Sequence, residues 1–176
     1  MRTSPAQAAA VLVPLFRDGE GELRLVLIRR AERGVHAGQI AFPGGRRDPA
    51  DADALATALR EAREEIGLEP RDVRVIAPLA EVVTRSTSFT IAPFLASIRR
   101  PERWRPDPAE VAEVLEVLVR DLTRPDAHGD SLEHMRGWPE PRRVPFYDVA
   151  GHRLWGATYR ILRPLIPRLL AGEWPL

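Results

Sequence analysis

The sequence predicts an α/β sandwich in which a mixed β-sheet lies between helices. Runs rich in β-branched and aliphatic residues, bounded by Gly, Pro and Asp, recur along most of the chain and indicate strands. Amphipathic helices are predicted near the middle of the chain, ending at Gly67, and near its C-terminal end, over 155–170. Strands combined with one central and one terminal helix are typical of layers packed around a single core.

The first predicted element is a β-hairpin. Its two runs, 9–16 and 23–28, are separated by the turn formers Asp18-Gly19 and Glu20-Gly21. A charged loop is predicted over 29–34. Further strands are predicted, in chain order, at 39–42, at 73–83 with an interruption at Pro78, at 89–98 with a bend near Pro93, and at 143–149.

Four later segments complete the prediction. Segment 101–108 contains three prolines and is predicted to be a loop. Segment 110–119 alternates acidic and aliphatic residues, a pattern that fits either a helix or a strand. Segment 126–141 is polar and rich in turn formers, which predicts an exposed loop. In the terminal helix, Pro164 and Pro167 predict a kink or a restart, because proline lacks an N–H and clashes with the preceding turn.

The central helix carries its own start and stop signals. Asp51 or Asp53 can cap its first turn, and Gly67 can end it in a left-handed conformation. One apolar stripe is predicted to face the core, formed by residues three or four positions apart: Leu55, Leu59, Ala62 and Ile66.

Three carboxylates crowd another part of this helix. Glu61, Glu64 and Glu65 stand at i, i+3 and i+4, where like charges repel. A hard divalent cation such as Mg²⁺ or Mn²⁺ would remove that repulsion, because such ions prefer carboxylate and carbonyl oxygens. Arg60, four residues before Glu64, can help to hold it. The alternative is a solvated acidic face that Arg60 and Arg63 neutralise.

The composition is that of a single globular domain, expected to span 1–176. Hydrophobic residues make up 44% and charged residues 29%, as in soluble proteins, and the net charge of +1 argues against partners that are nucleic acids or membranes. The absence of Cys excludes disulfides, thiolate catalysis and cysteine–zinc sites. No apolar run has the length of a membrane span. We therefore expect a cytoplasmic protein, monomeric or homodimeric.

Residues 45–68 resemble the Nudix box, G-x5-E-x7-R-E-U-x-E-E-x-G-U, in which U is aliphatic. Segment 60–68 matches the second half in full, with Ala62 at the first U, and Gly45 matches the first glycine. The early Glu of the pattern falls near Asp51, and the interval from Asp51 to Arg60 is one residue longer than in the pattern. The resemblance implies a Nudix-type α/β/α sandwich with a mixed β-sheet, and metal-dependent pyrophosphohydrolase activity.

Segment 25–45 also resembles the additional signature of Nudix coenzyme A pyrophosphatases, L-L-T-x-R-[SA]-x3-R-x3-G-x3-F-P-G-G. Leu25, Arg29, Gly38 and segment 42–45 match at the spacing of that family. Three positions depart clearly from it: Leu27 replaces Thr, Arg30 replaces Ser or Ala, and Gly34 replaces the second Arg, with Arg33 adjacent. Segment 152–158 resembles the aromatic Trp-Gly-x-Thr segment that opens the last helix of the family.

These resemblances imply roles for individual residues. The metal ligands would be Glu61, Glu64, Glu65 and the Gly45 carbonyl, and the catalytic residues Arg60, which would orient a glutamate, together with Glu61 and Glu64. A general base would be one of the three glutamates, or Glu110 or Glu113 of the later acidic segment. Substrate contacts would come from Arg29 and Arg33, whose guanidinium forks fit phosphate oxygens, and from Phe42 and Gly44.

The implied reaction is hydrolysis of coenzyme A, or its thioesters, to phosphopantetheine and adenosine 3′,5′-bisphosphate. Two alternatives stay open. One is a Nudix hydrolase that acts on ADP-ribose or another nucleoside diphosphate derivative, which Gly34 in place of Arg keeps open. The other is a Nudix-fold ligand-binding module without catalysis, which the intact segment 60–68 argues against.

Overall fold

The computed structural model describes residues 7–32, 36–84, 89–134 and 139–176. Within these ranges eight strands form the main sheet: β1 (Gln7–Arg17), β2 (Leu23–Arg30), β3 (Ile40–Ala41), β4 (Gly44–Arg46), β5 (Val73–Pro78), β6 (Val82–Val83), β7 (Phe89–Ile98) and β8 (Val111–Leu118). β1 runs parallel to β7 and antiparallel to β2 and β4, so the sheet is mixed, as predicted.

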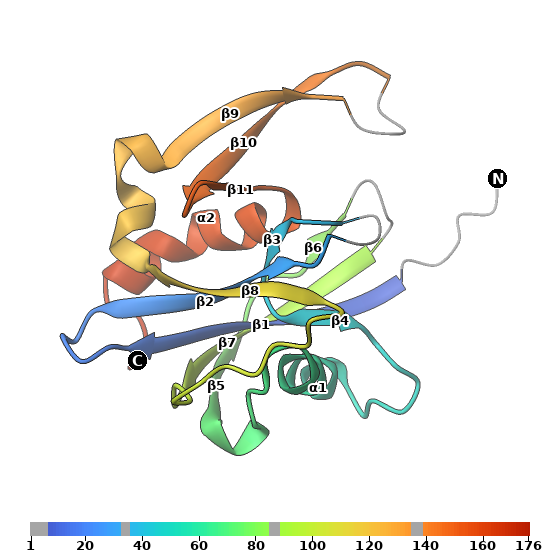
Figure 1. Ribbon diagram of the computed structural model, residues 1–176, viewed down its shortest axis with the longest axis vertical. Coiled ribbons are helices and arrows are strands. Elements are labelled where there is room, and N and C mark those ends of the chain that lie inside the picture. Colours follow the sequence, from blue (N-terminus) through green and yellow to red (C-terminus); the bar gives the residue numbers. More distant parts are fainter. Residues whose placement is uncertain (1–6, 33–35, 85–88, 135–138) are drawn as a thin grey trace.

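The helices α1 (Ala54–Ile66) and α2 (Gly156–Leu170) cover opposite faces of the main sheet (Figure 1). The side chains of β2 alternate between the two faces: Leu25 and Leu27 lie in the core against α2, and Val26 and Ile28 lie in the core against α1. All four are fully buried. A buried aliphatic side chain stabilises the fold by about 1.5–3 kcal/mol, so both helices are held mainly by apolar contacts. The predicted α/β/α sandwich is confirmed.

Two predicted boundaries next to the site are resolved by strand pairing. β2 continues to Arg30, so Arg29 and Arg30 lie in a strand and not in the predicted charged loop. The ambiguous segment 110–119 contains a strand, β8, because its aliphatic residues pair with β2 along almost its whole length. Segment 33–35, with Arg33 and Gly34, lies outside the described residues.

A second, antiparallel sheet consists of β9 (His128–Glu133), β10 (Arg142–Val149) and β11 (His152–Leu154), and β9 and β10 extend away from the main sheet (Figure 1). The exposed loop predicted over 126–141 is therefore wrong for 128–133. The polar, turn-forming composition of β9 does not predict a strand. The segment is a strand because it pairs with β10, which comes later in the chain.

The start and stop signals of α1 act as predicted, with Asp53 rather than Asp51 as the cap. The Asp53 carboxylate accepts a hydrogen bond of 2.7 Å from the Ala56 N–H, and Gly67 ends the helix with a φ of 70°. The buried face is rotated from the predicted stripe. It includes Thr57, Ala58 and Glu65 besides Ala62 and Ile66, whereas Leu55 and Leu59 are partly buried.

The restart predicted in the terminal helix is wrong, because α2 is continuous from Gly156 to Leu170 with Pro164 and Pro167 inside it, whereas the kink stays a prediction. The hydrogen bonds lost at the two prolines are offset by the burial of one apolar face against the sheet, formed by Ile161, Leu162, Leu165, Ile166 and Leu169.

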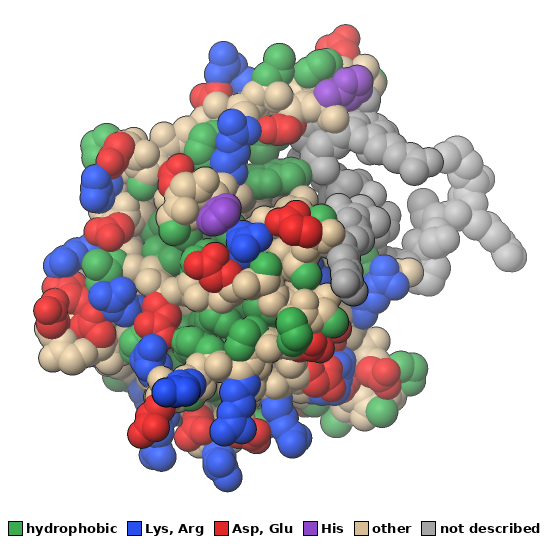
Figure 2. All heavy atoms as spheres, viewed as in Figure 1, with side chains coloured by type: hydrophobic (Ala, Val, Ile, Leu, Met, Phe, Trp, Pro, Cys, Tyr) green, Lys and Arg blue, Asp and Glu red, His purple; other side chains and the backbone are tan. Residues whose placement is uncertain are grey.

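Among the described residues on the face shown in Figure 2, basic and acidic side chains are interspersed, as the net charge of +1 implies. Within the described residues, neither α1 nor α2 is long and apolar enough to traverse a lipid bilayer.

Candidate active site

The candidate site lies where β4 meets α1, and two glycines shape it. A Cβ on Gly44 would lie 2.4 Å from the carbonyl oxygen of Ala10 in β1, and the Gly44 φ of 154° is rare for residues with side chains. A Cβ on Gly45 would lie 2.5 Å from a carboxylate oxygen of Glu61. The two missing side chains therefore let β4 approach β1 and α1 closely.

Glu65 is a buried carboxylate at this junction. It is 1% exposed, and its Oε2 accepts a hydrogen bond of 2.8 Å from the Gly44 N–H. Burial raises the pKa of Glu65 to about 8, although the Gly44 hydrogen bond and Arg30 act in the opposite direction. Within the described residues Glu65 forms an ion pair with the Arg30 guanidinium, whose Nη1 is 3.9 Å away, beyond hydrogen-bonding distance. The ionised carboxylate is therefore only partly compensated.

Two further carboxylates meet Glu65. Glu61, Glu65 and Glu110 each offer an oxygen atom within 4.8 Å of the other two. Glu61 comes from the preceding turn of α1, and Glu110 from the end of the loop that leads into β8. Burial also raises the pKa of Glu61, opposed by the charge of Arg60. Carboxylate oxygens are donors that Mg²⁺ and Mn²⁺ prefer, so the three residues fit such an ion.

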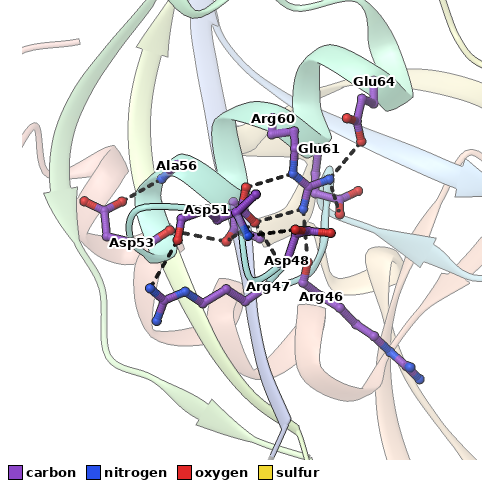
Figure 3. A network of polar contacts seen from close by, with 11 residues as sticks. Arg46, Arg47, Asp48, Asp51, Asp53, Ala56, Arg60, Glu61 and Glu64 are labelled. Carbon is purple, nitrogen blue, oxygen red and sulfur yellow. Dashed lines mark hydrogen bonds and ion pairs between the residues drawn. The ribbon is translucent and has the colours of Figure 1, made fainter.

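Arg60 joins the loop before α1 to the acidic residues of the helix (Figure 3). Its Nε and Nη2 donate hydrogen bonds of 2.9 Å and 3.0 Å to the two carboxylate oxygens of Asp51, and Nη2 also donates to the Arg46 carbonyl. Its Nη1 lies 2.8 Å from Glu64 and 3.0 Å from Glu61. Asp51 thus reaches Arg60 in spite of the extra residue between them.

The predicted site residues Glu64, Glu113 and Arg29 lie outside the carboxylate cluster. The Glu64 side chain is 58% exposed and pairs with Arg60. Glu113 points to Arg29, at 3.5 Å, and Arg29 also pairs with Glu32 at 3.1 Å. Arg29, predicted to contact phosphate, is thus already neutralised by two carboxylates.

The remaining predicted substrate contacts have different outcomes. Phe42 is 2% exposed and its side chain packs in the core against α2, so it does not face the carboxylate cluster from an open surface. Gly44 is buried beside β1, and its N–H donates a hydrogen bond to Glu65. Arg33 lies outside the described residues.

The geometry can be compared with known proteins. The model of the NUDIX domain family matches residues 6–140 of the chain. The chain belongs to the Nudix family. It is a Nudix hydrolase, an enzyme that hydrolyses phosphoric anhydride bonds, as the resemblance in the sequence implies.

Curated Nudix relatives share over a third of their aligned residues with the chain. The mitochondrial coenzyme A diphosphatase NUDT8 of Mus musculus is 37% identical over 175 residues, which cover 97% of this chain and 81% of the relative. The uncharacterized Nudix hydrolase NudL of Photorhabdus laumondii is 35% identical over 157 residues, covering 89% of this chain and 82% of the relative.

Solved Nudix structures agree with the fold. The Nudix hydrolase RenU from M. smegmatis has a TM-score of 0.68 and 22% identity, and the match covers 100% of this chain and 92% of that one. The NUDIX domain of Shewanella oneidensis NrtR, solved in complex with ADP ribose, has a TM-score of 0.53 and 16% identity, over 68% of this chain and 77% of that one. At these identities the likeness concerns the fold alone.

One residue beside the Nudix cluster is absent from the predicted site. Arg30 is a departure from the coenzyme A signature, and the structure places its guanidinium next to Glu65. The alternation of Val26, Ile28 and Arg30 on one face of the strand is the sequence signal that could have found it.

Proposed function

We propose that this Nudix hydrolase cleaves the diphosphate of coenzyme A or its thioesters, with Mg²⁺ or Mn²⁺, to give phosphopantetheine and adenosine 3′,5′-bisphosphate. The proposed metal-dependent hydrolysis rests on the cluster of Glu61, Glu65 and Glu110, whose oxygens lie within 4.8 Å of one another. The substrate rests on the match to segment 25–45 of the coenzyme A signature and on the likeness to a coenzyme A diphosphatase.

Glu61, Glu65, Glu110 and the Gly45 carbonyl would hold the divalent ion. When bound, the ion neutralises diphosphate charge and makes a bound water more acidic. Glu64, also implied as a ligand by the Nudix pattern, would have to exchange its 2.8 Å contact with Arg60 for the ion. Arg60, through Asp51 and Glu61, holds the first turns of α1 in position.

A water molecule must lose a proton as its oxygen attacks phosphorus, while the bond from phosphorus to the bridging oxygen breaks. Glu110 is our candidate for the base that takes this proton, because it is the exposed member of the cluster, open to water. Glu113, the other candidate from the acidic segment, is paired with Arg29 instead.

We infer further that residues 1–176 form one Nudix domain that acts on a small nucleotide. The core against α2 supports this, because it combines residues of β1, such as Leu15, with Leu154 of β11 and Leu162 of α2.

The test is turnover of the purified protein with Mg²⁺ and then Mn²⁺ on coenzyme A, acetyl-coenzyme A, ADP-ribose, NADH and a diadenosine polyphosphate. Products are separated by chromatography, and a chelator control removes the ion. We expect coenzyme A or its thioester to lead in kcat/KM by tenfold or more, about 1.4 kcal/mol in transition-state binding. If ADP-ribose leads instead, the coenzyme A proposal is wrong.

A further inference from the structure

Arg30 lies on the same face of the sheet as the carboxylate cluster. Along β2, Val26 and Ile28 face α1, and the period of two places Arg30 on that face. Its Nη1 lies 3.9 Å from Oε1 of Glu65. Arg29, the residue that matches the family signature, is paired with Glu32 and Glu113. Arg30 is therefore the arginine of this strand that reaches the cluster.

The backbone around Arg30 is fixed from two sides. Its N–H donates to the Gln39 carbonyl at 3.0 Å, and its own carbonyl accepts from the Gly38 N–H at 3.2 Å. The next residue, Ala31, donates to the carbonyl of Glu110 at 2.8 Å. The pairing of β2 with β8 also shifts register between Arg29, opposite Glu113, and Arg30, opposite Val111, so the extra residue lies on β8. The position of Arg30 is thus tied to that of Glu110, a member of the cluster.

The Arg30 guanidinium keeps its donors available. Within the described parts of the chain its side chain makes no hydrogen bond, and the contact with Glu65 is too long to be one. Its side chain is 34% exposed, so it is partly open to solvent. A guanidinium carries five N–H donors in a planar fork that matches two oxygens of a phosphate.

We propose that Arg30 binds the diphosphate of the substrate, donating hydrogen bonds to its oxygens beside the carboxylate cluster. This inference rests on the proposed function, in that it supposes a diphosphate substrate. Three carboxylates repel a diphosphate unless cations lie between or beside them, and Arg30 supplies a fixed positive charge at the edge of the cluster. Because it contacts the diphosphate, its effect is common to all diphosphate substrates.

The test compares Arg30→Met, which keeps the length of the side chain without its charge, with Arg30→Lys, which keeps the charge without the fork. The matched control is Arg99→Met, since Arg99 lies at the same 3.9 Å from a carboxylate, that of Asp72, but its side chain is 86% exposed. Binding of methylenebisphosphonate, a diphosphate analogue that resists hydrolysis because CH₂ replaces the bridging oxygen, is measured by calorimetry with Mn²⁺ present. Mn²⁺ binding is also measured alone.

We expect Arg30→Met to weaken bisphosphonate binding at least tenfold and to raise KM for coenzyme A and dephospho-coenzyme A alike. Arg30→Lys regains part of the loss, Arg99→Met matches the parent, and Mn²⁺ binding alone is unchanged or tighter in Arg30→Met. Bisphosphonate affinity within twofold of the parent, or a loss of Mn²⁺ binding and melting temperature together, would overturn the proposal. A loss confined to coenzyme A would also overturn it, because the guanidinium would then bind the 3′-phosphate.

The bisphosphonate experiment separates this inference from the proposed function. If the parent hydrolyses none of the diphosphate substrates, the proposed function fails. Weaker bisphosphonate binding by Arg30→Met would still support the contact between Arg30 and a diphosphate.

Discussion

The guanidinium of Arg60 and the carboxylate of Asp51 form a two-pronged ion pair, with Nε–Oδ1 at 2.9 Å and Nη2–Oδ2 at 3.0 Å (Figure 3). Asp51 also accepts hydrogen bonds from the Thr57 hydroxyl and the Asp48 N–H. The loop before α1 is thereby attached to the helix that carries the glutamates. Arg60 is left with one nitrogen, Nη1, directed at Glu61 and Glu64.

Removing this pair should disturb the site as well as the fold. Asp51→Asn leaves Arg60 without its charged partner, so we expect a lower melting temperature and a kcat at least tenfold below that of the parent. The control is Asp126→Asn, because Asp126 forms the same two-pronged pair with Arg124 at an exposed position. Thermal melts and turnover would contradict the expectation if the two variants behaved alike.

The pH dependence of this pair has a defined sign. Arg60 holds the pKa of Asp51 well below its ordinary value, so the ionised carboxylate stabilises the folded state above pH 3.8. That contribution is lost as the pH falls through the lowered pKa. We expect the difference in melting temperature between the parent and Asp51→Asn to shrink on acidification, and melts at several pH values below 4 check this.

Substitutions of the two glutamates of the later acidic segment should affect activity differently. Glu110→Gln removes a charge from the cluster, whereas Glu113→Gln removes only a partner of Arg29. We expect Glu110→Gln to lower kcat/KM at least tenfold and to weaken Mn²⁺ binding, and Glu113→Gln to change both far less. Steady-state kinetics and calorimetry on the two variants measure both effects. A larger loss with Glu113→Gln than with Glu110→Gln would contradict the placement of Glu110 in the site.

Alanine substitutions at the neighbouring Gly44 and Gly45 should have different effects on stability and on metal binding. In Gly44→Ala the new Cβ meets the backbone of Ala10, which cannot move without shifting β1, so we expect a markedly lower melting temperature. In Gly45→Ala the Cβ meets the end of the Glu61 side chain, which can turn away. We expect that variant to fold but to bind Mn²⁺ more weakly. Equal losses of stability in the two variants would contradict this.

The metal-free protein should become less stable as the pH rises. Burial raises the pKa of Glu65 to about 8, so the folded state favours the protonated form. The stability that this provides is present below the unfolded pKa of about 4.5 and is lost as the pH rises toward 8. Chemical unfolding of the parent and of Glu65→Gln with chelator, between pH 5 and 8.5, checks this: the decline should be smaller in the variant.

Binding of a divalent ion should reverse that trend, because the ion favours ionised Glu65. We expect Mn²⁺ affinity to increase from pH 6 to 8, with protons released on binding. Calorimetry in two buffers of different ionisation enthalpy measures the release, and an affinity independent of pH would contradict the expectation.

Local patterns in the sequence predicted the elements that carry the site. Asp53 caps the start of α1 and Gly67 ends it, as predicted, because capping interactions act within one helical turn. The β2 strand and the glycines of β4 were likewise predicted from neighbouring residues. The loop predicted over 126–141 is wrong for 128–133, because pairing with a later strand outweighs local propensity there. The restart predicted in α2 is wrong because the helix buries one apolar face.

The sequence by itself determined that Glu61, Glu64 and Glu65 share one region of α1, since helical spacing fixes which side chains are neighbours. Only the tertiary structure decided that Glu65 is buried against Gly44, that Glu64 remains exposed, and that Glu110 joins the cluster. The physical reason is that helical periodicity fixes the order of side chains around an axis. The packing of α1 on the sheet, and the register of β8 on β2, decide which of them face a common point.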